Sequence, residues 1–148
     1  MMDVAIVERT RTVNVLLVDD DDGDAKSVQR AFKSARIANP ITRAIDGIDA
    51  LDILRGTNGK TKLAPPYLLL VDLNMPRVNG IELVESLRQD RELHTCVVFM
   101  LTTSNRDEDK LAAYDSNVAG YIVKERAGQD FQRLIDMMQG YWRIVELP

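Results

Sequence analysis

The chain has 148 residues, a formal net charge of −4 and an isoelectric point near 5.0. This length suits a single domain with its own core, and the acidic balance, without a basic run or a basic patch interleaved with aromatic residues, argues against nucleic acid as a partner. One Cys and one His exclude a Cys/His metal site, and no apolar run is long enough for a membrane span, so we expect a cytoplasmic protein with no membrane partner.

The first predicted strand leads directly into a run of aspartates. Residues 13–18 form an apolar stretch that is too short for a helix and is typical of a strand buried on both faces. Four aspartates at 19–22 follow at once. A helix is predicted over 25–35, where Asp22 and Asp24 suit the positive N-terminal end of the helix.

The next stretch predicts a strand, a helix and a polar loop. Residues 41–45 predict the strand, and a turn at Asp46 precedes the helix. The predicted apolar stripe of this helix consists of Ile48, Ala50, Leu51 and Leu54. Residues 56–66 carry Gly and Pro at their ends and predict a long, mostly polar loop.

The most informative stretch is Leu68–Val71, which Asp72 follows directly. Four apolar residues predict a buried strand, and Pro76 cannot continue a central strand, so Asp72 lies where the strand opens into a loop. In open α/β sheets, ligands bind at this end of the strands. A helix that opens at 79–80 and a buried strand at 97–101 come next.

The last third of the chain predicts a helix, a strand and a longer helix. Residues 107–109 place three acidic side chains in a first helical turn, and 120–123 predict a fifth strand that Lys124 closes. The last helix is predicted from about 128 to 145, and a second apolar stripe on it suggests a partner protein or a homodimer. This stripe and its border consist of Met137, Tyr141, Trp142 and Ile144.

Strands and helices alternate five times, which predicts a parallel sheet with helices on both faces. Right-handed crossovers then bring polar side chains from the ends of four strands to one edge. These side chains are Asp19, Asp20, Asp72, Thr102 and Lys124. Carboxylates gathered in a partly buried place repel one another, so a positive charge must offset them. Hard oxygen ligands at a strand edge suit Mg²⁺.

In their order and spacing, four motifs resemble the receiver domain of two-component response regulators, the module that accepts a phosphoryl group. The motifs are the acidic pair after the first strand, Val-Asp-Leu-Asn-Met-Pro with Asn-Gly three residues on, Leu-Thr-Thr-Ser, and Gly-Tyr-Ile-Val-Lys. The resemblance implies a flavodoxin-like, doubly wound sheet of five parallel strands in the order 2-1-3-4-5. We therefore expect a receiver domain at 13–148 after an N-terminal extension at 1–12.

The resemblance implies a phosphoryl acceptor and a magnesium site. Asp72 matches the aspartate that receives the phosphoryl group from the phosphohistidine of a sensor kinase. Asp19 and Asp20 match the acidic pair that holds Mg²⁺, together with Asp72 and the backbone carbonyl of Asn74. Lys124 matches the lysine that pairs with the phosphoryl group.

The resemblance also implies a switch and residues that tune its lifetime. Thr102 matches the hydroxyl that moves to the phosphoryl group, and Tyr121 matches the aromatic residue whose rotamer follows. Together they would couple the site to the face made by the fourth helix, the fifth strand and the fifth helix. Asn74 and Ser104 flank the site and would tune dephosphorylation. Glu125 stands where the family usually has Pro, which leaves the isomer of the preceding peptide bond open.

The polar loop before the third strand and the ending Tyr-Trp-Arg-Ile-Val-Glu-Leu-Pro resemble a narrower group. These are the small single-domain regulators paired with bacterial phytochrome-type kinases. The expected partner is therefore a phytochrome-type sensor histidine kinase, and the expected output is self-association as a homodimer or binding of another protein. A relay that passes the phosphoryl group from Asp72 to a histidine phosphotransfer protein fits the same residues.

Two other functions fit less well. A small Mg²⁺-dependent phosphohydrolase with an aspartyl-phosphate intermediate needs an Asp two residues after the nucleophile, and Asn74 stands there after Asp72. Asp19 and Asp21 have the required spacing, but the chain has no insertion to enclose a substrate. A degenerate receiver is disfavoured because the acidic residues, Thr102 and the lysine are all present. We expect a phosphoacceptor that is no enzyme beyond losing its own phosphoryl group.

Overall fold

The computed structural model of this chain describes residues 12–73, 75, 80–102 and 118–133. Its strands are β1 (Asn14–Val18), β2 (Ile41–Ala44), β3 (Tyr67–Asp72), β4 (Val97–Thr102) and β5 (Gly120–Val123). Its helices are α2 (Asp22–Ser34), α3 (Gly47–Arg55), α4 (Gly80–Gln89) and the short 3₁₀ turn η1 (Lys124–Arg126). Residues 127–133 continue from η1 as a helix.

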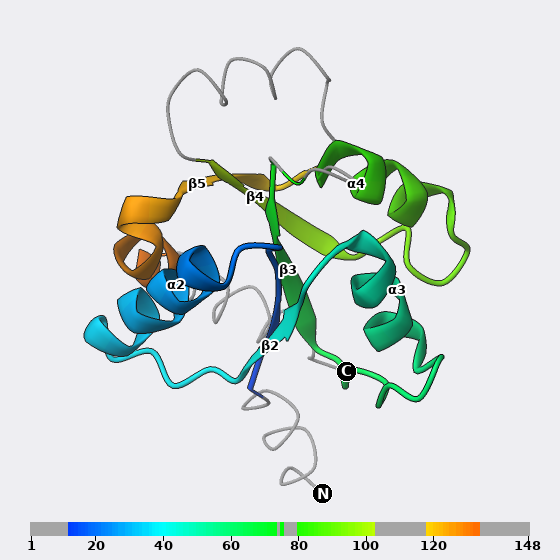
Figure 1. Ribbon diagram of the computed structural model, residues 1–148, viewed down its shortest axis with the longest axis horizontal. Helices are drawn as coiled ribbons and strands as arrows, with labels where there is room; N and C mark the ends of the chain where they lie inside the picture. Colours follow the sequence, from blue (N-terminus) through cyan, green and yellow to red (C-terminus); the bar gives the residue numbers. More distant parts are fainter. Residues whose placement is uncertain (1–11, 74, 76–79, 103–117, 134–148) are drawn as a thin grey trace, which may run out of the picture.

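The strands form one parallel sheet in the order β2-β1-β3-β4-β5. β1 lies between β2 and β3, because Val18 pairs with Ala44 on one side and with Val71 on the other, and β3 is the central strand. Helix α2 and the helix at 127–133 cover one face of the sheet, and α3 and α4 cover the other (Figure 1). The prediction of a flavodoxin-like, doubly wound sheet is confirmed.

Alternation along the strands divides the core into two layers. In β1, Leu16 and Val18 belong to the layer beneath α3 and α4, whereas Val15 and Leu17 belong to the layer beneath α2. All four side chains are fully buried. Burying an aliphatic side chain of this size contributes roughly 1.5–3 kcal/mol. The central strands are continuous apolar runs because both of their faces are covered.

Helices α2 and α3 begin at the edge of the sheet where β1 and β2 end. The side chain of Asp21 accepts a hydrogen bond from the Asp24 N–H at 3.0 Å, and that of Asp46 accepts from the Asp49 N–H at 2.7 Å. These caps satisfy backbone donors that a first helical turn leaves free. Helix α2 therefore starts at Asp22, earlier than the sequence predicts.

One predicted core residue lies at the surface. Ile48 is 63% exposed, whereas Ala50 and Leu54 are buried and Leu51 is partly buried. A step of two residues turns an α-helix by about 200°, so Ile48 cannot share a face with Ala50. The buried stripe takes in Ile53 instead. The prediction for Ile48 is wrong.

Some predictions concern residues that the structure does not describe. Residues 1–11, most of the expected extension, and the acidic turn at 107–109 lie outside the described residues. No helix in the described ranges is long and apolar enough to cross a membrane. The bond between Lys124 and Glu125 is trans, because the one cis peptide among the described residues precedes Pro66.

Candidate functional site

Buried polar residues gather at one edge of the sheet. Within the described part of the chain they are Asp19 after β1, Asp72 at the end of β3 and Thr102 at the end of β4, with exposures of 0%, 4% and 0%. The register pairs Asp72 with Leu101, the residue before Thr102. The carboxyl ends of parallel strands meet at one edge, so this convergence agrees with the sequence-based prediction.

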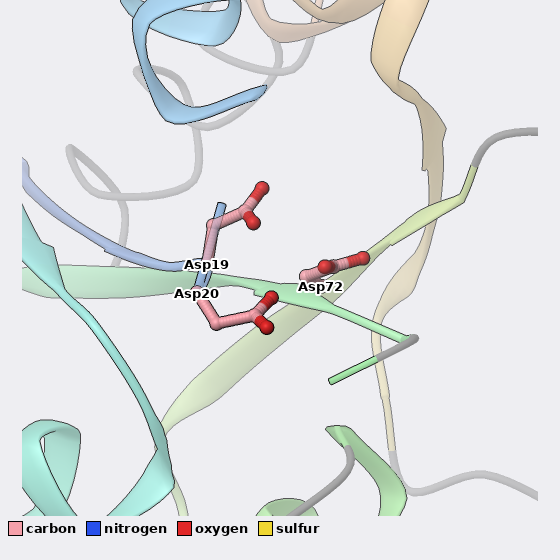
Figure 2. Close-up of side chains that lie close together, drawn as sticks. All are labelled: Asp19, Asp20 and Asp72. Carbon is pink, nitrogen blue, oxygen red and sulfur yellow. The ribbon is translucent and has the colours of Figure 1, made fainter. Parts of the chain in front are cut away.

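Three carboxylates lie together at this edge. Asp19, Asp20 and Asp72 each offer one oxygen, and these oxygens all lie within 4.8 Å of one another. Figure 2 shows the three side chains grouped, two from the end of β1 and one from β3. Asp20 is exposed while the other two are buried, so the group is open to solvent on the Asp20 side.

Lys124, the first residue of η1, lies against these carboxylates. Its Nζ is 3.1 Å from Asp19 Oδ2, 3.3 Å from Asp72 Oδ1 and 2.7 Å from Asp24 Oδ2. Burial by itself lowers the pKa of the lysine, but the carboxylates of Asp24, Asp72 and Asp19 outweigh burial and raise this pKa above its ordinary value. Lys124 is therefore a fixed positive charge at neutral pH.

Asp24 also belongs to this site, although the sequence pattern predicts for it only a position at a helix end. It does lie in the first turn of α2, but its carboxylate also accepts a hydrogen bond from Lys124. This hydrogen bond is the main reason why the pKa of Asp24 lies below its ordinary value. The two residues are 100 positions apart, so no local pattern pairs them. The one available signal was an acidic residue near the start of a helix that begins at the site edge.

Arg43 on β2 fixes the backbone of the loop that carries the acidic pair. Its Nε and Nη2 donate to the carbonyl oxygen of Asp19 at 3.1 and 2.9 Å, and its Nη1 pairs with the carboxylate of Asp22. The N–H of Asp21 also donates to Asp19 Oδ1 at 3.0 Å. These contacts hold both the backbone and the side chain of Asp19. Arg43 is not among the site residues predicted from the sequence.

The donor set fits a hard divalent cation. Asp19 Oδ2 is buried and makes no hydrogen bond within the described residues, although Lys124 Nζ lies 3.1 Å from it. Mg²⁺ is typically held by one or two carboxylates and keeps several waters, and the exposed side of Asp20 gives those waters room. Three negative charges lie close together here, and Lys124 pairs with the carboxylates of Asp19 and Asp72, so a further cation reduces the remaining repulsion.

Thr102 and Tyr121 lie on the same face of two paired strands. Tyr121 pairs with Met100 in the β4–β5 ladder, and Thr102 lies two residues beyond Met100 on the same face. Tyr121 packs partly buried against the core layer beneath α3 and α4. The Oγ1 atom of Thr102 is buried and has no hydrogen-bond partner in the described part of the chain. Its hydroxyl is therefore available to an acceptor that arrives at the site.

The remaining predicted functional residues lie outside the described residues. They are Asn74 and Ser104, expected beside the site, and Met137, Tyr141, Trp142 and Ile144, expected in the last helix. What these residues do stays a prediction.

Comparisons with known proteins agree on one family. The model of the family described as the response regulator receiver domain matches residues 15–138. Response regulator Rcp1 from Synechocystis sp. is 30% identical over 135 residues, which are 90% of this chain and 92% of that protein. The bacteriophytochrome response regulator RtBRR has a TM-score of 0.73 at 30% identity, with 85% of this chain and 77% of that chain covered. The Mn²⁺-bound form of Rcp1 has a TM-score of 0.63 at 29% identity, with 88% of this chain and 94% of that chain covered.

Proposed function

The chain belongs to the response regulator receiver domain family of two-component systems, and we propose that it accepts a phosphoryl group on Asp72 from a sensor histidine kinase. One observation carries this proposal. The buried carboxylate of Asp72 lies 3.3 Å from the ammonium of Lys124 and beside the carboxylates of Asp19 and Asp20. Phosphoryl transfer to an aspartate requires a positioned nucleophilic oxygen and positive charge around it, and this arrangement can supply both.

Asp72 supplies the nucleophile. One of its carboxylate oxygens forms a bond to phosphorus while the bond from phosphorus to the histidine nitrogen of the kinase breaks, and the imidazole leaves. The ammonium of Lys124 lies beside Asp72 Oδ1 and offsets part of the repulsion between the carboxylate and the phosphoryl oxygens. Thr102 donates its buried hydroxyl to one phosphoryl oxygen.

The proposed cofactor is Mg²⁺, with Asp19, Asp20, Asp72 and the backbone carbonyl of Asn74 as its protein ligands. When bound, it would add the positive charge that brings an anionic donor to a carboxylate-rich site. The contacts of Arg43 and of the Asp21 N–H keep the Asp19 ligand in place. The Mn²⁺-bound form of the similar protein Rcp1 supports a divalent cation as cofactor.

Thr102 and Tyr121 form the proposed switch. When Thr102 turns to a phosphoryl oxygen, it vacates space on the face that it shares with Tyr121, and the tyrosine ring can rotate inward. The change would reach the face formed by the segment at 107–117, β5 and the last helix. The residues proposed for contact on this last helix are Met137, Tyr141, Trp142 and Ile144.

The proposed output is self-association as a homodimer or binding of another protein in the cytoplasm. The proposed input is a phytochrome-type kinase, because two bacteriophytochrome response regulators are similar to this chain over most of its length. The protein itself acts as a phosphoacceptor, with slow loss of its own phosphoryl group as its only catalysis. Asn74 and Ser104 are proposed to set the rate of that loss.

Intact mass after incubation with Mg²⁺ and acetyl phosphate tests the phosphoacceptor function. We expect one added phosphoryl group, found on the peptide that contains Asp72 and absent when EDTA removes Mg²⁺. If neither this donor nor a purified phytochrome-type kinase adds a phosphoryl group, the proposed function is wrong.

Sedimentation of the same samples tests the proposed homodimer. We expect Tyr141→Glu to weaken self-association and to leave phosphoryl uptake unchanged, because a buried carboxylate at an apolar interface is unfavourable. A wild-type protein that stays monomeric at high concentration, with and without the phosphoryl group, would contradict the homodimer.

A further inference from the structure

Lys124 has a third carboxylate partner that comes from a helix and not from a strand end. Its Nζ lies 2.7 Å from Asp24 Oδ2, closer than the 3.1 Å to Asp19 and the 3.3 Å to Asp72. An ammonium has three N–H donors and no acceptor. Each of the three donors therefore has a carboxylate within reach.

Two contacts fix the elements that carry this ion pair. Phe32 of α2 stacks on Phe131 of the following helix, with ring centroids 4.3 Å apart. At Gly128 the two elements approach so closely that a Cβ would lie 2.3 Å from the carbonyl oxygen of Ala31. Asp24, near the start of α2, thus faces the lysine from a packed helix and not from a loop.

Asp24 differs from the other two partners in what else it can bind. Asp19 and Asp72 belong to the three carboxylates whose oxygens converge as possible cation ligands, and Asp24 does not. A divalent cation there would take up oxygens of Asp19 and Asp72 and would repel the nearby ammonium. The carboxylate of Asp24 would stay with the lysine and offset this repulsion.

We propose that Asp24 is a positioning residue that holds the ammonium of Lys124 beside Asp72 while the cation and the phosphoryl group bind. This inference rests on the proposed phosphoacceptor function and adds a residue outside the motifs on which the family resemblance depends. Asp24 acts through Lys124, so its removal matters only while the lysine is present.

The test compares the rate of phosphoryl uptake from acetyl phosphate at saturating Mg²⁺, read by intact mass. The variants are Asp24→Asn, Lys124→Ala and the double variant, with Asp24→Ser as a second way to remove the carboxylate. Asp52→Asn is the matched control, because Asp52 is also a helical carboxylate but accepts hydrogen bonds from Thr57 and Asn58 and not from the lysine.

We expect Asp24→Asn and Asp24→Ser to slow uptake about fivefold, in keeping with the loss of a partly exposed ion pair. Asp52→Asn should keep the wild-type rate. In the Lys124→Ala background, Asp24→Asn should have no further effect. An unchanged rate in both Asp24 variants overturns the proposal, and so does an equal slowing with and without the lysine.

The same four proteins of the Asp24/Lys124 cycle are also unfolded in urea without a phosphodonor. We expect the two substitutions to be coupled by about fivefold in the unfolding equilibrium constant. If their effects on the free energy of unfolding are additive, the proposed ion pair between Asp24 and Lys124 is wrong. This measurement separates the two proposals. A wild-type protein that takes up no phosphoryl group contradicts the phosphoacceptor function, and the coupling then still decides whether Asp24 holds the lysine.

Discussion

The middle of the sheet and its carboxyl edge are buried to the same degree but differ in chemistry. Leu16 and Leu69 in the central strands are fully buried, and so is Asp19 at the edge, with Asp72 only 4% exposed. Burial of the leucines removes apolar surface from water and stabilises the fold. Burial of the carboxylates opposes their charged form and brings like charges together, and the ammonium of Lys124 offsets only part of this.

The difference separates what folds the protein from what it does. The same strands carry apolar residues that hold the sheet together and end in charges that the sheet holds in an unfavourable arrangement. Substitutions in the two regions should therefore have opposite consequences. Those in the core should change the free energy of unfolding, and those at the edge should change phosphoryl uptake.

Asp72→Asn should have the largest effect of all on uptake and little effect on the fold. The amide cannot form the acyl phosphate, so we expect complete loss of the added mass. The free energy of unfolding in urea without Mg²⁺ should equal or exceed that of the wild type, because one of three clustered charges is gone. Stoichiometric labelling of this variant would falsify Asp72 as acceptor.

Leu69→Ala should have the reverse profile. Leu69 is fully buried in β3, so its truncation should lower the free energy of unfolding by about 2–5 kcal/mol. Uptake per folded molecule should stay close to that of the wild type. Ile48→Ala is the matched control, because its side chain is 63% exposed and its truncation should change stability by less than about 0.5 kcal/mol. A large loss in this control would mean that Ile48 is buried after all.

Gly80→Ala should affect both regions at once. A Cβ at this position would lie 2.5 Å from the carbonyl oxygen of Asp72 and 2.6 Å from the Met100 side chain. We expect a loss of about 1–3 kcal/mol in unfolding free energy and slower uptake, because the backbone of the acceptor must shift. Gly23→Ala is the control, since its Cβ would make only an ordinary contact with Asp21. Wild-type uptake in Gly80→Ala would show that the acceptor tolerates this displacement.

Binding of Mg²⁺ should have the smallest effect, a gain in stability that depends on residues at the carboxyl edge of the sheet. At ten times its dissociation constant, a cation that binds only the folded state stabilises it by about 1.4 kcal/mol. We expect this gain in thermal or urea unfolding of the wild type and its loss in Asp20→Asn, whose exposed side chain contributes little to the core. An equal gain in both proteins would place the bound cation elsewhere.

The sequence predicts those parts of the molecule whose position in the fold follows from the pattern of neighbouring residues. An apolar run followed by a carboxylate predicts both β3 and the position of Asp72, and alternation of strands and helices predicts the sheet. The partners of Lys124 and Asp19 could not be predicted in full, because Asp24 and Arg43 reach them only through the docking of α2 and the pairing of β2. The prediction that Ile48 belongs to a buried stripe is wrong for another reason, since a set of nearby apolar residues does not by itself define one helical face.

The bond between Asp24 and Lys124 joins residues 100 positions apart, and this separation bears on how the site forms in time. Closing a long loop is entropically unfavourable, and folds dominated by contacts distant in sequence fold slowly. During synthesis the acidic residues that follow β1 leave the ribosome long before β5 does. An incomplete chain thus exposes aspartates without their lysine, and only a chain that has finished folding presents the assembled site.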